Sequence, residues 1–94
     1  MHLFEVSRYG GQIQTVAPSD AEHLAAIAAE NARSCAKGRM SDKNVEALTE
    51  QWTPLLDALQ VGERLELVAY ASAYKVGINA GVSDKHVIRV HRVS

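Results

Sequence analysis

The sequence predicts a two-layer α+β domain with the element order ββααβββ, in which both helices pack on one face of a mostly antiparallel sheet. Three observations support this prediction. A glycine pair separates two short strand-like segments at the N-terminus, two consecutive segments carry apolar residues at helical spacing, and the C-terminal third alternates with a period of two. Residues 1–94 are expected to form a single domain with one core.

The first element is predicted to be a β-hairpin. Residues 3–8 and 12–17 flank Gly10 and Gly11, and a glycine pair supplies the positive φ angles that a two-residue turn needs. That turn also sets which side chains share a face. The set expected to point into the core is Phe4, Val6, Ile13 and Thr15.

The first helix is expected to begin at Ser19 and to end at Gly38. Ser19 is the predicted N-cap, because Glu22 three residues later completes a capping box. The single cysteine, Cys35, excludes an internal disulfide. It lies near the C-terminal end of the helix, where the helix dipole disfavours a thiolate, and we interpret it as a buried structural residue.

The second helix is predicted to start after Ser41 and to stop before Gly62. Its apolar stripe consists of Val45, Leu48, Trp52, Leu55, Leu56 and Leu59. Pro54 either kinks this helix or begins a new one, because proline lacks the amide hydrogen that a helix interior uses. The phase of the stripe is the same on both sides of Pro54, which favours one kinked, nearly continuous helix.

Three strands are predicted after the helices, at residues 63–72, 74–79 and 85–93. In the last of these, Ile88 and Val90 are expected to face the core, whereas Arg89 and His91 face the other way. Antiparallel sheets commonly leave one face to water, so these two side chains should be solvent-exposed.

The uncovered sheet face is the first candidate binding surface. Its expected residues are Tyr9, Val68, Tyr70, Lys75, Arg89 and His91. Aromatic side chains beside arginines are typical of interfaces. The alternative is an ordinary solvated surface that binds nothing, on which lysines and arginines discourage pairing with another strand. A second candidate surface is the acidic side of the second helix, which carries Glu46 and Glu50.

No catalytic, cofactor or metal signature accompanies these surfaces. The histidines lack metal-ligand spacing, since His86 and His91 are five residues apart on a strand and point to opposite faces. Asp84 and His86 share a strand face, but only the common Ser83 stands near them as a nucleophile. No glycine-rich segment has the Gly-Lys-Ser/Thr ending that is specific to a phosphate-binding loop. The sequence therefore predicts no catalytic residue, no cofactor and no metal.

The favoured function is a non-enzymatic protein-binding or inhibitor module that acts on a larger intracellular partner. A phage- or mobile-element-encoded antagonist of a host nucleic-acid-handling complex is one form of this hypothesis. The alternatives are a nucleic-acid-binding domain that uses the basic and aromatic sheet face, and a small oligomeric enzyme. A net charge of −1 argues against a general nucleic-acid-packaging protein.

The sequence also carries expectations about location and assembly. No apolar run is long enough to cross a membrane and no secretory signal is present, so a cytoplasmic location is expected. A homo-oligomer is a further alternative, in which an exposed final strand pairs with its copy about a two-fold axis.

Overall fold

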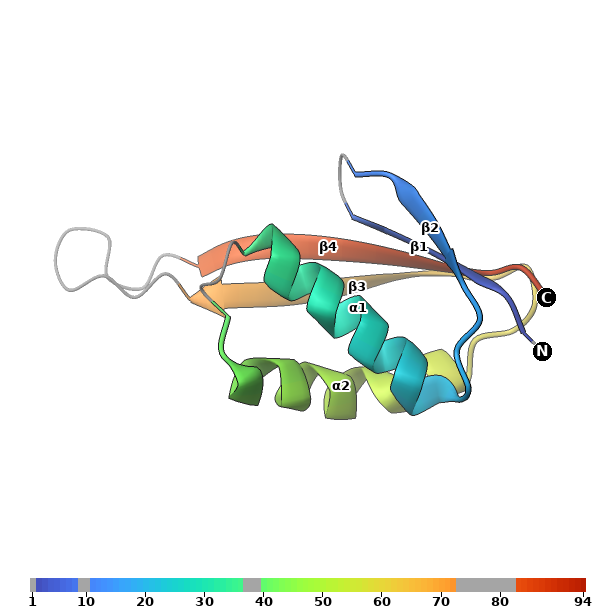
Figure 1. The fold of residues 1–94 in the computed structure, drawn as a ribbon, viewed down its shortest axis with the longest axis horizontal. Helices are drawn as coiled ribbons and strands as arrows, with labels where there is room; N and C mark the ends of the chain where they lie inside the picture. The colour runs from blue at the N-terminus through green and yellow to red at the C-terminus, as the bar shows by residue number, and fades with distance from the viewer. Residues whose placement is uncertain (1, 9–10, 37–39, 73–82) are drawn as a thin grey trace, which may run out of the picture.

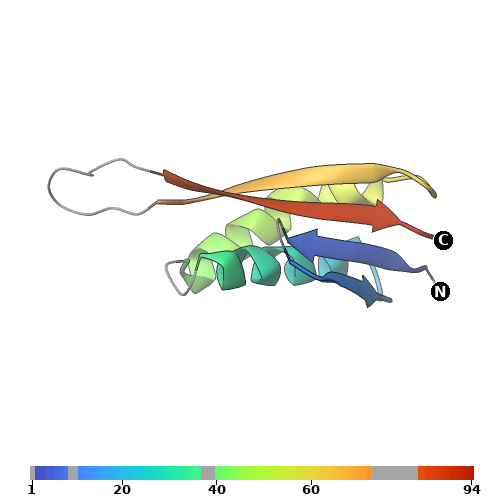
Figure 2. The same ribbon diagram turned by 90° about the horizontal axis from the view of Figure 1, so that it is seen from above.

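The computed structural model describes residues 2–8, 11–36, 40–72 and 83–94. The elements are β1 (Phe4–Arg8), β2 (Ile13–Val16), α1 (Ala21–Cys35), α2 (Asp42–Asp57), β3 (Arg64–Ser72) and β4 (Ser83–Arg92). The strands form one antiparallel sheet in the order β2-β1-β4-β3. Both helices lie on the same side of this sheet (Figure 1 and Figure 2), which confirms the predicted two-layer α+β class.

The described element order is ββααββ. The strand predicted at residues 74–79 lies outside the described residues. β3 and β4 pair directly with each other from Arg64↔His91 to Ser72↔Ser83, so no further strand stands between them. β4 also pairs with β1 on its other side. The final strand is therefore an inner strand, and the expectation that it pairs with a second copy is wrong.

The N-terminal hairpin forms with a register one residue away from the predicted one. Phe4 pairs with Val16 and Ser7 pairs with Ile13, whereas a two-residue Gly10-Gly11 turn would pair Val6 with Thr15. A shift by one residue moves every side chain of a strand to the opposite face. The prediction of Ile13 and Thr15 as core residues is therefore wrong: both are exposed, and Val16 packs against the core instead. Phe4 and Val6 are buried as predicted.

α1 begins one residue later than predicted. Asp20 is the N-cap, and its Oδ1 accepts a hydrogen bond of 2.8 Å from the His23 backbone N–H. The Ser19 N–H donates to Nδ1 of His23 at 3.1 Å. The His23 side chain therefore accepts the backbone hydrogen bond that the predicted capping box assigned to Glu22. Cys35, at the last turn, is half-buried and packs against the core. Besides Leu24, the buried face of α1 consists of Ala25, Ala28, Ala29 and Ala32.

α2 runs without a break through Pro54, so Pro54 does not begin a new helix. Ser41 is its N-cap, as predicted, and Ser41 Oγ accepts from the Asn44 N–H at 3.2 Å. Trp52 and Leu56 are buried, but Leu55 is 49% exposed, so its assignment to the core is wrong.

The core lies between the helices and the inner face of the sheet. Ile88 and Val90 of β4 and Leu67 of β3 are fully buried there, which confirms the predicted alternation of both strands. The largest fully buried side chains are Trp52, Leu24, Leu67, Ile88, Val6 and Val90. Among the residues that the structure describes, no helix is both long and apolar enough to cross a membrane.

Candidate functional site

The side of the sheet that faces away from the helices is the main candidate site, and we call it the open face. Residues that pair across neighbouring strands point to the same face, so the strand register assigns each side chain. The open face comprises Ile13, Thr15, Glu5, Ser7, Lys85, Val87, Arg89, His91, Arg64, Glu66, Val68 and Tyr70.

Four of the six residues predicted for this surface lie on the open face. Arg89 and His91 belong to the inner strand β4, and Val68 and Tyr70 belong to the edge strand β3, where Tyr70 has 63% of its surface exposed. Tyr9 and Lys75, predicted for the same surface, lie outside the described residues.

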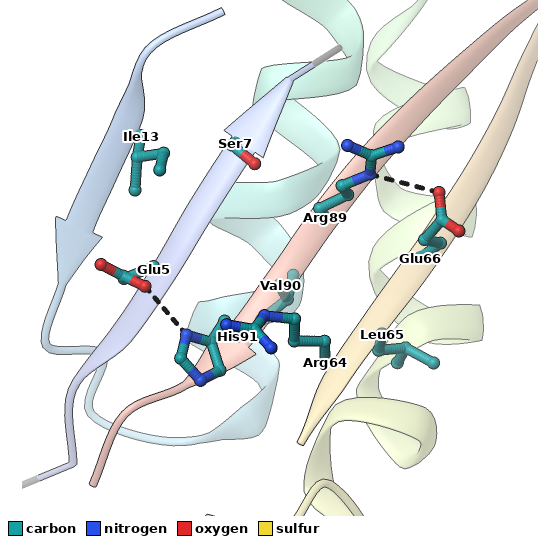
Figure 3. Close-up of a pocket in the computed structure, with 9 residues that line it drawn as sticks. All are labelled: Glu5, Ser7, Ile13, Arg64, Leu65, Glu66, Arg89, Val90 and His91. Carbon is teal, nitrogen blue, oxygen red and sulfur yellow. Dashed lines mark hydrogen bonds and ion pairs between the residues drawn. The ribbon is translucent and has the colours of Figure 1, made fainter. Parts of the chain in front are cut away.

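Two polar contacts tie three strands together on the open face (Figure 3). Arg89 Nε lies 3.3 Å from Glu66 Oε2, across the β3–β4 pair. His91 Nδ1 lies 2.8 Å from Glu5 Oε1, across the β1–β4 pair, and this contact is an ion pair when the imidazole is protonated. Arg89 and His91 of β4 thus each have a carboxylate beside them.

Glu5 and Glu66 were not predicted as site residues. Period-two alternation places both carboxylates on the uncovered face, but it does not say which residue stands opposite which. The partners follow only from the order and register of the strands. Ile13 is a third residue that sequence reasoning missed here, because the hairpin register was shifted by one.

A shallow hollow lies between these side chains, and its lining residues are labelled in Figure 3. It is lined by Glu5, Ser7, Ile13, Arg64, Leu65, Glu66, Arg89, Val90 and His91. Ser7 contributes a hydroxyl, but in the described structure the His91 ring contacts Glu5 rather than Ser7. The hollow therefore combines charged, aliphatic and hydroxyl groups without the hydrogen-bonded nucleophile and base of a hydrolase.

Glu46 and Glu50 belong to a second surface, a groove between α1 and α2 on the opposite side of the molecule. Glu22 of α1 joins them there, and the lining is otherwise mostly small or apolar. The complete lining is Glu22, Ala26, Val45, Glu46, Thr49, Glu50, Thr53 and Pro54. We call this surface the acidic groove.

Cys35 and His86 line a smaller pocket together with Lys85 and Val87. His86 faces the helices, and its Nε2 is buried without a hydrogen-bond partner in the part of the chain that the structure describes. Within residues 2–8, 11–36, 40–72 and 83–94, no group of three His, Cys, Asp or Glu side chains is arranged to hold a metal ion.

Comparison with protein-family models, with curated proteins and with solved structures finds no match for this chain. The open face and the acidic groove are therefore the features of the molecule that indicate a function.

Proposed function

We propose that this protein is a non-catalytic binding module that contacts a larger protein through its open face, as an inhibitor or a regulatory subunit. The observation that carries the proposal is the make-up of that face. Exposed Ile13 and Tyr70 lie around a centre in which Arg89 is ion-paired with Glu66. Aromatic residues and arginine are enriched at protein interfaces, where polar groups surround apolar contacts.

The paired charges favour a protein over a nucleic acid. A phosphate-binding surface needs several cations that are free to replace counterions. On the open face, a phosphate near Arg89 would also approach Glu66, and one near His91 would approach Glu5. Among the described residues of this face, only Arg64 and Lys85 are cations without a carboxylate contact. The two carboxylates beside Arg89 and His91 would oppose the binding of a polyanion, whereas a protein can present matching charges of both signs.

The acidic groove offers a second contact to the same kind of partner. Glu22, Glu46 and Glu50 flank an apolar lining on the helical side. A partner whose own ligand is a nucleic acid carries a basic surface, and three carboxylates around an apolar floor would complement it. An inhibitor that occupies the nucleic-acid site of a host complex is the specific form of the proposal that this groove supports.

The test begins with affinity capture from the native host, using the tagged wild type and Arg89→Glu. We expect Arg89→Glu to weaken capture of the partner at least about tenfold, which corresponds to about 1.4 kcal/mol. The fold should be kept, because Arg89 is exposed and two like charges across a strand pair cost less than about 1 kcal/mol.

A charge swap, Arg89→Glu with Glu66→Arg, is the matched control. It restores the cross-strand pair but exchanges the two charges, so we expect it to fold like wild type and still to lose the partner. Full capture by the swap would mean that Arg89→Glu acts only by breaking the cross-strand pair. The open face would then not be the surface that contacts the partner. Glu46→Lys combined with Glu50→Lys tests the acidic groove separately.

A titration with single-stranded and duplex nucleic acid tests the alternative function. We expect no binding at low salt. A complex that weakens steeply between about 50 and 200 mM salt would instead establish nucleic-acid binding and contradict the proposal.

A further inference from the structure

The two edges of the sheet differ greatly in length. β2 forms one edge with four residues, whereas β3 forms the other with nine. Within the described residues, β3 pairs on one side only, with β4. Long uncovered edges present rows of free backbone donors and acceptors, and proteins usually cover or blunt them.

The hydrogen bonds at the start of β3 identify its free backbone groups. The Arg92 N–H donates to the Glu63 carbonyl at 3.0 Å, and antiparallel pairs alternate between bonded and non-bonded positions. The N–H and C=O groups of the odd-numbered residues therefore point toward β4. Those directed at the free edge belong to Arg64, Glu66, Val68 and Tyr70.

An apolar flank lies beneath the same edge. α2 lies on the β3 side of α1 (Figure 2). Thr53 of α2 lines the acidic groove, on the side of α2 that faces α1. Leu55 follows two residues later, a rotation of about 200° around the helix axis, so it lies on the flank of α2 that faces away from α1. Leu48, seven residues earlier on that flank, is half-buried, as is Leu65 on the inner side of β3. This position explains why Leu55 is 49% exposed although it continues the apolar stripe.

We propose that a second copy of this chain covers the β3 edge and the α2 flank, about a two-fold axis beside Leu67. Antiparallel pairing in this register joins the two four-stranded sheets into one continuous sheet. The Leu55 side chains of the two copies approach each other below it. Both open faces then lie on the same side of the dimer.

The edge is self-complementary in this register. Arg64 and Tyr70 lie three residues on either side of Leu67, so each Arg64 stands opposite the partner's Tyr70, a cross-strand cation and aromatic pair. Glu66 stands opposite the partner's Val68. The two Glu66 carboxylates are only diagonal neighbours, and each has its own Arg89 beside it. No pair of like charges stands directly opposite, which favours a second copy as the occupant.

Sedimentation equilibrium of the full chain tests the dimer. We expect the wild type to sediment at twice its chain mass of 10.2 kDa. Leu55→Glu should raise the dimer dissociation constant at least about 100-fold, because it places two carboxylates in the apolar contact. Ile13→Glu, at an even more exposed apolar residue on the opposite edge, should leave it unchanged. A monomeric wild type at about 0.5 mM, or a fully dimeric Leu55→Glu, would overturn the proposal.

Amide hydrogen exchange tests the edge itself. In the wild type we expect slow exchange at Arg64, Glu66, Val68 and Tyr70, and fast exchange at these positions in Leu55→Glu. The amides of the alternate residues, bonded to β4, should be protected in both. Fast exchange at the four edge amides of a dimeric wild type would show that the dimer uses another surface.

The dimer and the proposed function share Tyr70 of the open face, but they can be separated at Leu55. Leu55 lies on the helical side and not on the open face. Leu55→Glu should therefore separate the copies while the partner is still captured. A Leu55→Glu variant that stays dimeric contradicts the dimer alone, whereas an Arg89→Glu variant that still captures the partner contradicts the proposed function alone.

Discussion

At the scale of single residues, Gly62 is a position where backbone conformation restricts the choice of amino acid. The Glu63 N–H donates to the Gln60 carbonyl at 3.0 Å, which closes a turn between α2 and β3. Gly62 is the third residue of that turn, with a φ of +88°, and its N–H donates to the Arg92 carbonyl at 2.8 Å. A turn of this shape favours glycine at its third position.

Gly62→Ala is expected to lower the free energy of unfolding by about 1–2 kcal/mol, because a side chain is disfavoured in the left-handed region. A Cβ at this position meets no atom of the described residues within 4 Å, so the whole effect should come from the backbone. Gly62→Asn should cost less, since asparagine tolerates positive φ better than alanine. Urea denaturation of the three proteins measures the order. Equal stability of all three would contradict the proposed conformational cost.

At the scale of elements, the contact between α1 and α2 depends on alanine. Ala25, Ala28, Ala29 and Ala32 of α1 are completely buried, and α1 packs against α2 as well as against β1 and β4. Small side chains allow the helix axes to approach closely. At the end away from the termini, Arg33 Nη2 lies 2.8 Å from Asp42 Oδ1 and joins the end of α1 to the start of α2.

Ala29→Leu is expected to destabilise the fold by about 1–3 kcal/mol, because the larger side chain forces two packed helices apart. The control is Ala47→Leu on the exposed side of α2, where leucine and alanine have similar helix propensities and a change within about 0.5 kcal/mol is expected. Thermal and urea unfolding measure both variants. Equal effects of the two substitutions would show that the helices are not closely packed at Ala29.

The elements differ in how far local sequence determines them. α2 could be predicted through Pro54, since one apolar phase spans it, and the inner residues of β3 and β4 follow from alternation alone. Which side chains of β2 face the core could not be predicted, because the two alternating sets of that strand are similarly apolar. Only the geometry of the turn decides between them. The partners of Arg89 and His91 could not be predicted either. Glu66 and Glu5 lie beside them because of the strand order, which is set by pairing between distant segments.

At the scale of the whole molecule, Arg92 joins segments that are far apart in the sequence. Its Nη1 donates to the Leu59 carbonyl at 2.8 Å, and the guanidinium lies 5.9 Å from the centre of the Phe4 ring. Its Nε donates to the Ser94 carbonyl at 3.2 Å. The two chain ends lie next to each other, where Leu3 N–H donates to Ser94 Oγ at 2.9 Å (Figure 1). One side chain thus connects the loop after α2, the first strand and the C-terminus.

Arg92→Lys is expected to lower the free energy of unfolding by about 1–2 kcal/mol although it keeps the charge. A lysine ammonium cannot reach several acceptors with a planar fork or stack flat on a ring, so the partly buried Leu59 carbonyl loses its donor. Arg89→Lys is the matched control. Arg89 is exposed and makes one ion pair, so a change below about 0.5 kcal/mol is expected. Urea denaturation compares the two substitutions, and equal effects would mean that Arg92 contributes only as a surface charge.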